Sequence, residues 1–171
     1  MDNIFSNDIF SIAILILALI MLGFNFLPGR RRKTQGEAPQ SADVRALQLQ
    51  ACERLILLME RINPTELVLR YSNHAGTAID LQRLLLNAVR DETAHNYAQQ
   101  LYVSNAAWAQ VMAARNTIMN LINQSAGAMQ PGDPAVALSK KIIDNAALLD
   151  PPPTLNAIKA IKADARKNIK A

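Results

Sequence analysis

The chain has few of the residues on which most catalytic and metal sites depend. Its 171 residues include one cysteine, two histidines and six scattered glycines. A single cysteine cannot form an internal disulfide, and one cysteine with two histidines cannot alone supply the four ligands of a structural zinc site. The glycines form none of the loops that hold nucleotide phosphates. These counts exclude disulfide scaffolds, zinc fingers and nucleotide-binding loops.

Aromatic residues are scarce outside the N-terminal segment. All four phenylalanines lie within the first 26 residues, which leaves three tyrosines and one tryptophan for the remainder. No segment shows the alternating apolar and polar pattern of a strand. A core of leucine, isoleucine, valine, methionine and alanine is typical of packed helices. We therefore expect an all-α domain.

One long apolar run stands out, from Ile9 to Leu27. It contains no charged residue, and as a helix it would be about 28 Å long, close to the thickness of the hydrocarbon core of a bilayer. The run is longer than the apolar part of a cleavable signal peptide, and no lysine or arginine precedes it. The sequence predicts a retained, single transmembrane helix.

Four basic residues follow this run directly. Because lysine and arginine collect on the cytoplasmic side of membrane helices, we expect the N-terminus outside and the rest of the chain in the cytoplasm. Residues 1–33 form the anchor with its basic collar, and the polar residues 34–41 form a linker. The collar is either a topology signal alone or also a contact for anionic lipid. Its members are Arg30, Arg31, Arg32 and Lys33.

Beyond the linker, apolar residues recur every three or four positions, as in amphipathic helices. We expect a cytoplasmic bundle of four to five helices over residues 42–150, followed by a proline-rich spacer and a basic amphipathic helix over 151–171. The capping residues place the helices more closely. The expected helices are 42–62, 64–71, 78–101, 105–125, 134–149 and 154–170, with Ser41, Asn63, Thr77, Ser104, Asp133 and Thr154 at their starts.

The same patterns predict which side chains are buried. The apolar run from Leu55 to Met59 indicates a central helix that is covered on several sides, and Tyr97 is expected to face inward. Cys52 lies among apolar neighbours and is interpreted as a small core residue. Glu66 and Arg70 have the spacing of a pair along one helix. Arg54 and Arg61 share a face, so they could pair with another helix.

The tail helix carries five basic residues against one acid. Such helices bind anionic membranes or partner proteins, pack as the last helix of a bundle, or form a mobile tail, and these alternatives stay open. Residue 33 is followed by 14 basic and 12 acidic residues, a balance that argues against a nucleic-acid partner. The candidate lipid contacts in the tail are Lys159, Lys162, Arg166, Lys167 and Lys170.

Neutral polar and aromatic residues cluster near the end of the third expected helix. They either stabilise the turn between two helices or form a recognition surface for a protein partner. The members of this candidate interaction surface are His95, Asn96, Gln99, Gln100, Tyr102 and Trp108.

One motif allows an alternative function. Glu92 and His95 are three residues apart on one helix, as in the helices of di-iron bundles, and Glu53 and Glu60 could add carboxylates. The motif occurs once, so a metal-binding or enzymatic role is the second hypothesis. We predict no cofactor and no catalytic residue.

Two stretches, QACERLILLMERINPTELVLR and HNYAQQLYVSNAAW, are similar to an uncharacterised family of short bacterial proteins of Bacteroidota. The resemblance covers roughly residues 5–125 and implies one membrane helix, a cytoplasmic helical domain and a location in the bacterial inner membrane. It implies no activity. The leading hypothesis is a membrane-anchored interaction or scaffolding module, with its partner and oligomeric state left open. The matching residues are Glu53, Arg54, Glu60, Arg61, Pro64, Leu69, Arg70, His95, Asn96, Gln99, Gln100, Leu101, Tyr102, Ser104 and Trp108.

Overall fold

A computed structural model describes residues 42–130 and 132–170 of the chain. The predicted membrane helix, its basic collar, the linker and the cap at Ser41 all lie outside the described residues. Within the part that is described, no helix is both long enough and apolar enough to cross a membrane.

The described residues are helical, as the sequence predicts, and they contain no strand beyond one isolated backbone bridge. All six expected helices are present. The largest difference is that the helix from residue 78 ends at Asn96 and continues as a 3-10 turn to Leu101. The elements are α2 (Ala42–Arg61), α3 (Pro64–Tyr71), η1 (Ser72–His74), α4 (Ala78–Asn96), η2 (Tyr97–Leu101), α5 (Asn105–Gly127), α6 (Ala135–Ala147) and α7 (Pro153–Lys170).

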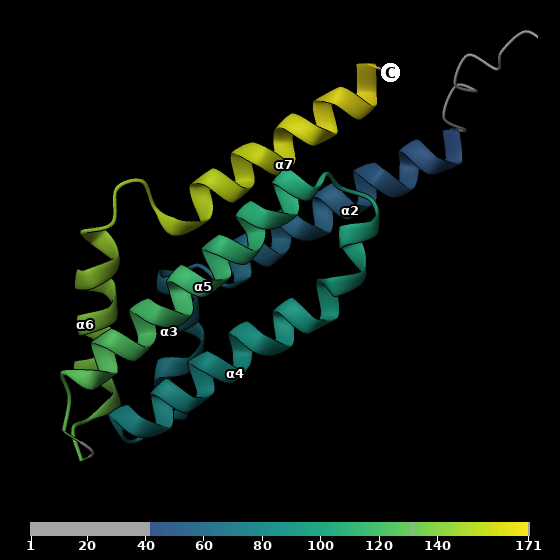
Figure 1. Ribbon diagram of the computed structural model, residues 1–171. Coiled ribbons are helices and arrows are strands. Elements are labelled where there is room, and N and C mark those ends of the chain that lie inside the picture. The colour runs from purple at the N-terminus through teal and green to yellow at the C-terminus, as the bar shows by residue number, and fades with distance from the viewer. Residues whose placement is uncertain (1–41, 131, 171) are drawn as a thin grey trace, which may run out of the picture. The chain divides into compact units, whose positions relative to one another are not determined.

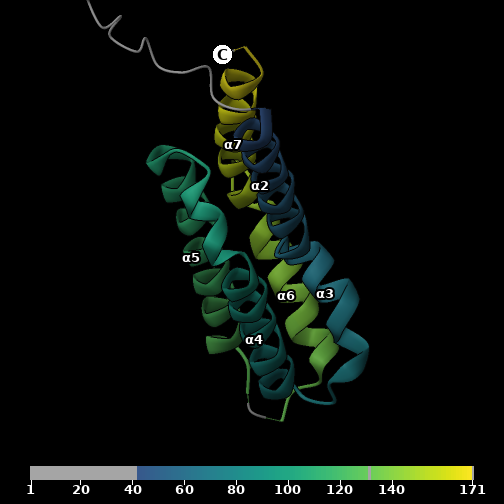
Figure 2. The same ribbon diagram turned by 90° about the vertical axis from the view of Figure 1, so that its right-hand side faces the viewer.

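The helices form an elongated bundle in which α5 lies between α7 and α4 (Figure 1), on the opposite side of the bundle from α3 (Figure 2). α4 and α5 are antiparallel neighbours, α6 packs against α3, α4 and α5, and α7 packs against α5 and α2. α7 runs antiparallel to both of its neighbours, so its C-terminal end lies at the same end of the bundle as Ala42 (Figure 1). The first and last described residues therefore share one end.

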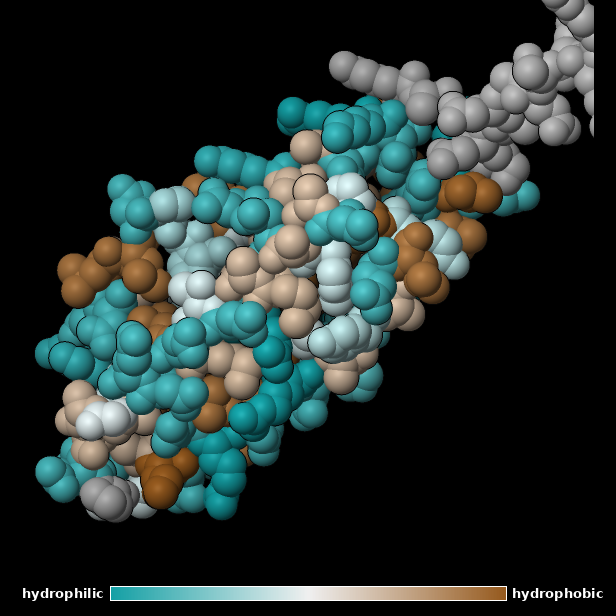
Figure 3. Space-filling view, viewed as in Figure 1, coloured by the Kyte–Doolittle hydropathy of each residue, from teal (hydrophilic) through white to brown (hydrophobic). Residues whose placement is uncertain are grey.

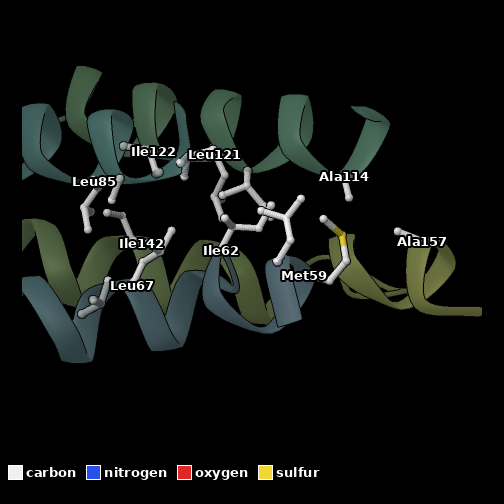
Figure 4. Packing of buried hydrophobic residues seen from close by; sticks show 14 of the residues in the cluster. Met59, Ile62, Leu67, Leu85, Ala114, Leu121, Ile122, Ile142 and Ala157 are labelled. Atoms are coloured by element: carbon white, nitrogen blue, oxygen red, sulfur yellow. The ribbon is translucent and has the colours of Figure 1, made fainter. Parts of the chain in front are cut away.

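A single apolar core connects all six helices. Figure 4 shows side chains from α2 and α3 meeting those of α4, α5 and α6, with Met59, Ala114 and Ala157 at one end of the cluster. Most core residues are aliphatic, as the lack of aromatics predicts. Cys52 is buried in this core, which confirms its interpretation as a packing residue. The largest fully buried side chains are Leu55, Leu58, Met59, Ile62, Leu67, Leu81, Leu85, Ile118, Ile122, Leu138, Ile142 and Ile161.

The structure decides between the alternatives for the tail helix. Ala157 and Ile161 of α7 are fully buried, and Asp164 is buried as well. The apolar side of α7 therefore belongs to the bundle core and packs on α2 and α5. The sequence correctly predicts an amphipathic helix. Its apolar side is covered by other helices of the bundle and not by a membrane.

Three predicted caps are confirmed. The side chains of Asn63, Thr77 and Ser104 accept hydrogen bonds from the backbone N–H groups of Thr65, Asp80 and Ala107, respectively. Each bond satisfies a backbone donor that the first turn of a helix leaves without a partner.

Two predicted caps are wrong. Helix α6 begins at Ala135, after Pro134, and the Asp133 carboxylate accepts a hydrogen bond from the Gln130 N–H instead. The backbone of Asp133 pairs with the loop before α4, where its carbonyl accepts from the N–H of Ala78 at 2.7 Å. This contact between distant loops leaves no sequence signal. Thr154 lies inside the first turn of α7, because Pro153 starts the helix.

The prediction that α2 is covered on several sides is confirmed, because α7, α3 and α4 pack against it. Its remaining side is open, and Leu57 there is 56% exposed. The predicted burial of Tyr97 is wrong. Tyr97 is 46% exposed, because α4 ends one residue before it. Its ring lies edge-on to Trp108, with the ring centroids 5.5 Å apart.

Candidate functional site

A cleft of about 360 Å³ lies between α2 and the C-terminal end of α4. Four of its residues are spaced by three and four positions along α2, and three are spaced in the same way along α4. This spacing places each set on one side of its helix. The cleft is lined by Arg54, Leu57, Leu58 and Arg61 from α2 and by Glu92, His95 and Asn96 from α4.

Glu92 organises the charges in the cleft. Its carboxylate lies 3.2 Å from Nη1 of Arg61 and 3.8 Å from Nη1 of Arg70, which comes from α3. Nη2 of Arg70 also donates a hydrogen bond to the backbone carbonyl of Arg61 at 3.1 Å. The Glu92 side chain is only 18% exposed, whereas both guanidinium groups reach solvent. One half-buried carboxylate thus connects three helices.

This arrangement disfavours the metal-binding alternative. Both oxygens of Glu92 face guanidinium groups, and a metal cation would have to displace these positive charges. Neither Glu53 nor Glu60 lines the cleft. In residues 42–130 and 132–170, no three histidine, cysteine, aspartate or glutamate side chains are grouped closely enough to hold a metal ion. The spacing of Glu92 and His95 therefore reflects one helix face, and Glu92 joins α4 to α2 and α3.

The cleft also contains groups without partners in the described structure. Arg54 makes no hydrogen bond or ion pair with another described residue, and it lies one helical turn from the exposed Leu57. His95 is exposed beside them. An apolar side chain next to an unpaired cation suits a partner that offers both an apolar group and a carboxylate.

The predicted polar and aromatic cluster is divided by the fold. His95 and Asn96 line the cleft, and Nδ2 of Asn96 donates a hydrogen bond to the Glu92 carbonyl at 2.8 Å. The backbone carbonyl of Gln99 accepts a hydrogen bond from the backbone N–H of Tyr102 and closes the η2 turn. Trp108 packs against the core and Tyr97, while Gln100 is exposed. Trp108 therefore belongs to the packing of the bundle, whereas the bond between Gln99 and Tyr102 joins backbone atoms and depends on neither side chain.

The charged pairs of the sequence are rearranged. No ion pair joins Glu66 to Arg70 in the described chain, because Arg70 turns toward Glu92. The shared face of Arg54 and Arg61 is correctly predicted, and Arg61 pairs with another helix. Leu57 was missed as a site residue. The three-residue step from Arg54 to Leu57 and the four-residue step to Arg61 could have indicated it.

The only cysteine is not part of the cleft. Burial raises the pKa of the Cys52 thiol above its ordinary value of 9.0, and the nearby carboxylates of Asp164 and Glu53 raise it further. The thiol therefore stays protonated at neutral pH. Because the thiolate is the reactive form, Cys52 is not poised for nucleophilic chemistry.

Comparison with known proteins gives one match. The model of a family of unknown function, DUF7935, matches residues 3–168, nearly the whole chain. No curated protein matches the chain, and no solved structure matches it.

Proposed function

The chain belongs to the DUF7935 family of unknown function, and from its geometry we propose that it is a membrane-anchored protein-interaction module. The docking site is the cleft between α2 and α4. The observation that carries this proposal is the exposed Leu57 between Arg54 and Arg61 on the wall of a cleft. The occupant is a protein segment that places an apolar side chain on Leu57 and a carboxylate on Arg54.

The chemistry of the cleft supports a protein partner over a small substrate. Its walls are open to solvent, and its one carboxylate is held by two arginines. Its one histidine, His95, is exposed and forms no hydrogen bond with another described residue that would orient it as a base. Arginine is frequent at protein interfaces because it binds carboxylates with two parallel hydrogen bonds.

The membrane location belongs to the same proposal. The apolar run from Ile9 to Leu27 and the basic residues after it support a location in a bacterial inner membrane, with the bundle in the cytoplasm. Fusing either a fluorescent protein or alkaline phosphatase to the C-terminus tests this topology. A fluorescent fusion and an inactive phosphatase support it, and an active phosphatase contradicts it.

The docking site is tested by crosslinking in the full-length protein. A photo-reactive residue replaces Leu57 in one version and Val136 in a second, because Val136 is an exposed apolar residue on α6. We expect a discrete protein adduct from position 57 and none from position 136. Adding Arg54→Glu should remove the adduct at position 57, because it reverses the charge that attracts the carboxylate. Equal labelling from both positions, or an adduct that survives the charge reversal, would refute the proposed site.

A further inference from the structure

The outer face of α7 carries an uncompensated positive charge. Lys159, Lys162, Arg166 and Lys167 are all exposed, and none forms an ion pair or hydrogen bond with another described residue. The only acid of the helix, Asp164, is buried on the opposite side. The exposed face of α7 therefore contains cations and no carboxylate.

The neighbouring helices do not neutralise this face. Helix α5 has a single charged residue, Arg115, and α2 has three acids and three arginines. Hydrophilic residues predominate along the edge of the molecule where α7 runs (Figure 3, compared with Figure 1). Unpaired cations on one surface attract a polyanion and are released from it by salt.

The direction of α7 relates this face to the anchor. The C-terminal end of α7 lies at the same end of the bundle as the N-terminal end of α2, which begins at Ala42 (Figures 1 and 2). Fourteen residues, 28–41, separate Ala42 from the end of the predicted membrane helix, and even fully extended they reach about 50 Å. A bundle on so short a tether stays within reach of the membrane surface.

We infer that the solvent-exposed face of α7 binds the anionic phospholipid head groups of the membrane in which the chain is anchored. This inference rests on the proposed anchor and is independent of the cleft. The contact is electrostatic, because Ala157 and Ile161 are buried in the core and cannot enter the bilayer. Among the described residues, the candidate lipid contacts are thus Lys159, Lys162, Arg166 and Lys167 on the outer face of α7.

The test uses the full-length protein in lipid vesicles. Ala163 is exposed on the same face of α7, and a cysteine placed there can carry a fluorophore while Cys52 is buried. Vesicles contain a quencher attached to lipid head groups and consist of phosphatidylcholine, with or without an equal amount of phosphatidylglycerol. We expect strong quenching with phosphatidylglycerol, weak quenching without it, and a loss of quenching at about 1 M salt, where the screening length is about 3 Å.

A matched pair of variants identifies the charges. Each basic residue near an anionic membrane strengthens binding several-fold, so Lys159→Gln, Lys162→Gln and Arg166→Gln together should weaken the contact by roughly a hundredfold. The control variant, Arg83→Gln, Arg90→Gln and Lys140→Gln, removes equal charge from exposed positions on α4 and α6 and should quench like the parent.

Equal quenching in both lipid mixtures would overturn the inference. It would also be overturned if the control variant lost as much quenching as the α7 variant. The comparison of lipid mixtures uses the parent protein, so it holds even if a variant fails to fold. Failure of the anchor is detected separately, because a chain without a membrane helix is extracted from the vesicles by alkaline carbonate. Failure of the docking cleft appears only in the crosslinking at position 57.

Discussion

The carboxylate of Asp164 accepts a hydrogen bond from the backbone N–H of Ser104, at 2.7 Å across sixty residues of sequence. Ser104 is the N-cap of α5, and its own hydroxyl accepts the N–H of Ala107 at 3.1 Å. Helix N-termini carry a partial positive charge and unpaired N–H groups, so a buried anion is favourable there. Helix α7 thereby supplies a hydrogen-bond acceptor for the first residue of the α5 cap.

Replacing Asp164 with alanine should destabilise the bundle by about 2 kcal/mol, because it removes the hydrogen bond that the Ser104 N–H donates to a buried carboxylate. Denaturant unfolding in detergent, followed by the fluorescence of Trp108, measures this change. Asp144→Ala is the control, since Asp144 is an exposed acid on α6. Equal stability of the two variants would show that the Asp164 bond contributes nothing.

Two isoleucines of α7 should behave differently when shortened. Ile161→Ala should cost about 3 kcal/mol, because it removes a fully buried side chain from the core. Ile169→Ala should change stability by less than about 0.5 kcal/mol, because this residue is 65% exposed. The difference in unfolding midpoint measures how firmly α7 packs on the bundle. A small effect at both positions would mean that α7 detaches in solution.

The ion pair between Arg61 and Glu92 should contribute modestly. A double-mutant cycle with Arg61→Gln and Glu92→Gln should give a coupling free energy of about 0.5 kcal/mol, because Arg61 is well exposed to solvent. Thermal unfolding of the four proteins at low salt provides the value. A coupling free energy near zero would mean that Arg70 is the only arginine whose contact with Glu92 can contribute to stability.

The raised pKa of Cys52 predicts a loss of stability in alkali. Below the unfolded-state pKa of 9.0 both states keep the thiol proton, and its contribution to stability is present in full. Above that pH the unfolded thiol ionises while the folded thiol does not. The contribution is therefore lost as the pH rises from 9.0 through the raised folded-state pKa. Unfolding at a series of pH values should show a steeper alkaline decline for the parent than for Cys52→Ala. Identical declines would show that folding does not raise the pKa of Cys52.

Local chemistry explains which features the sequence predicts well. Asn63, Thr77 and Ser104 act on N–H groups two or three residues away, so their roles depend on nearby residues only. Asp133 and Arg70 have equally clear local patterns, but each bonds to a segment that is distant in sequence. Leu57 is apolar in an apolar run, and only the placement of the other helices leaves it exposed.

By itself, the sequence determined the helical class, the order of the six described helices and the charged face of α7, because these follow from composition and period. Tertiary structure alone decided that α7 packs on α2 and α5, that Glu92 holds two arginines, and that Asp164 caps α5. The physical reason is that periodicity shows which side of a helix is apolar or charged, whereas the partner of that side depends on how all the helices pack together.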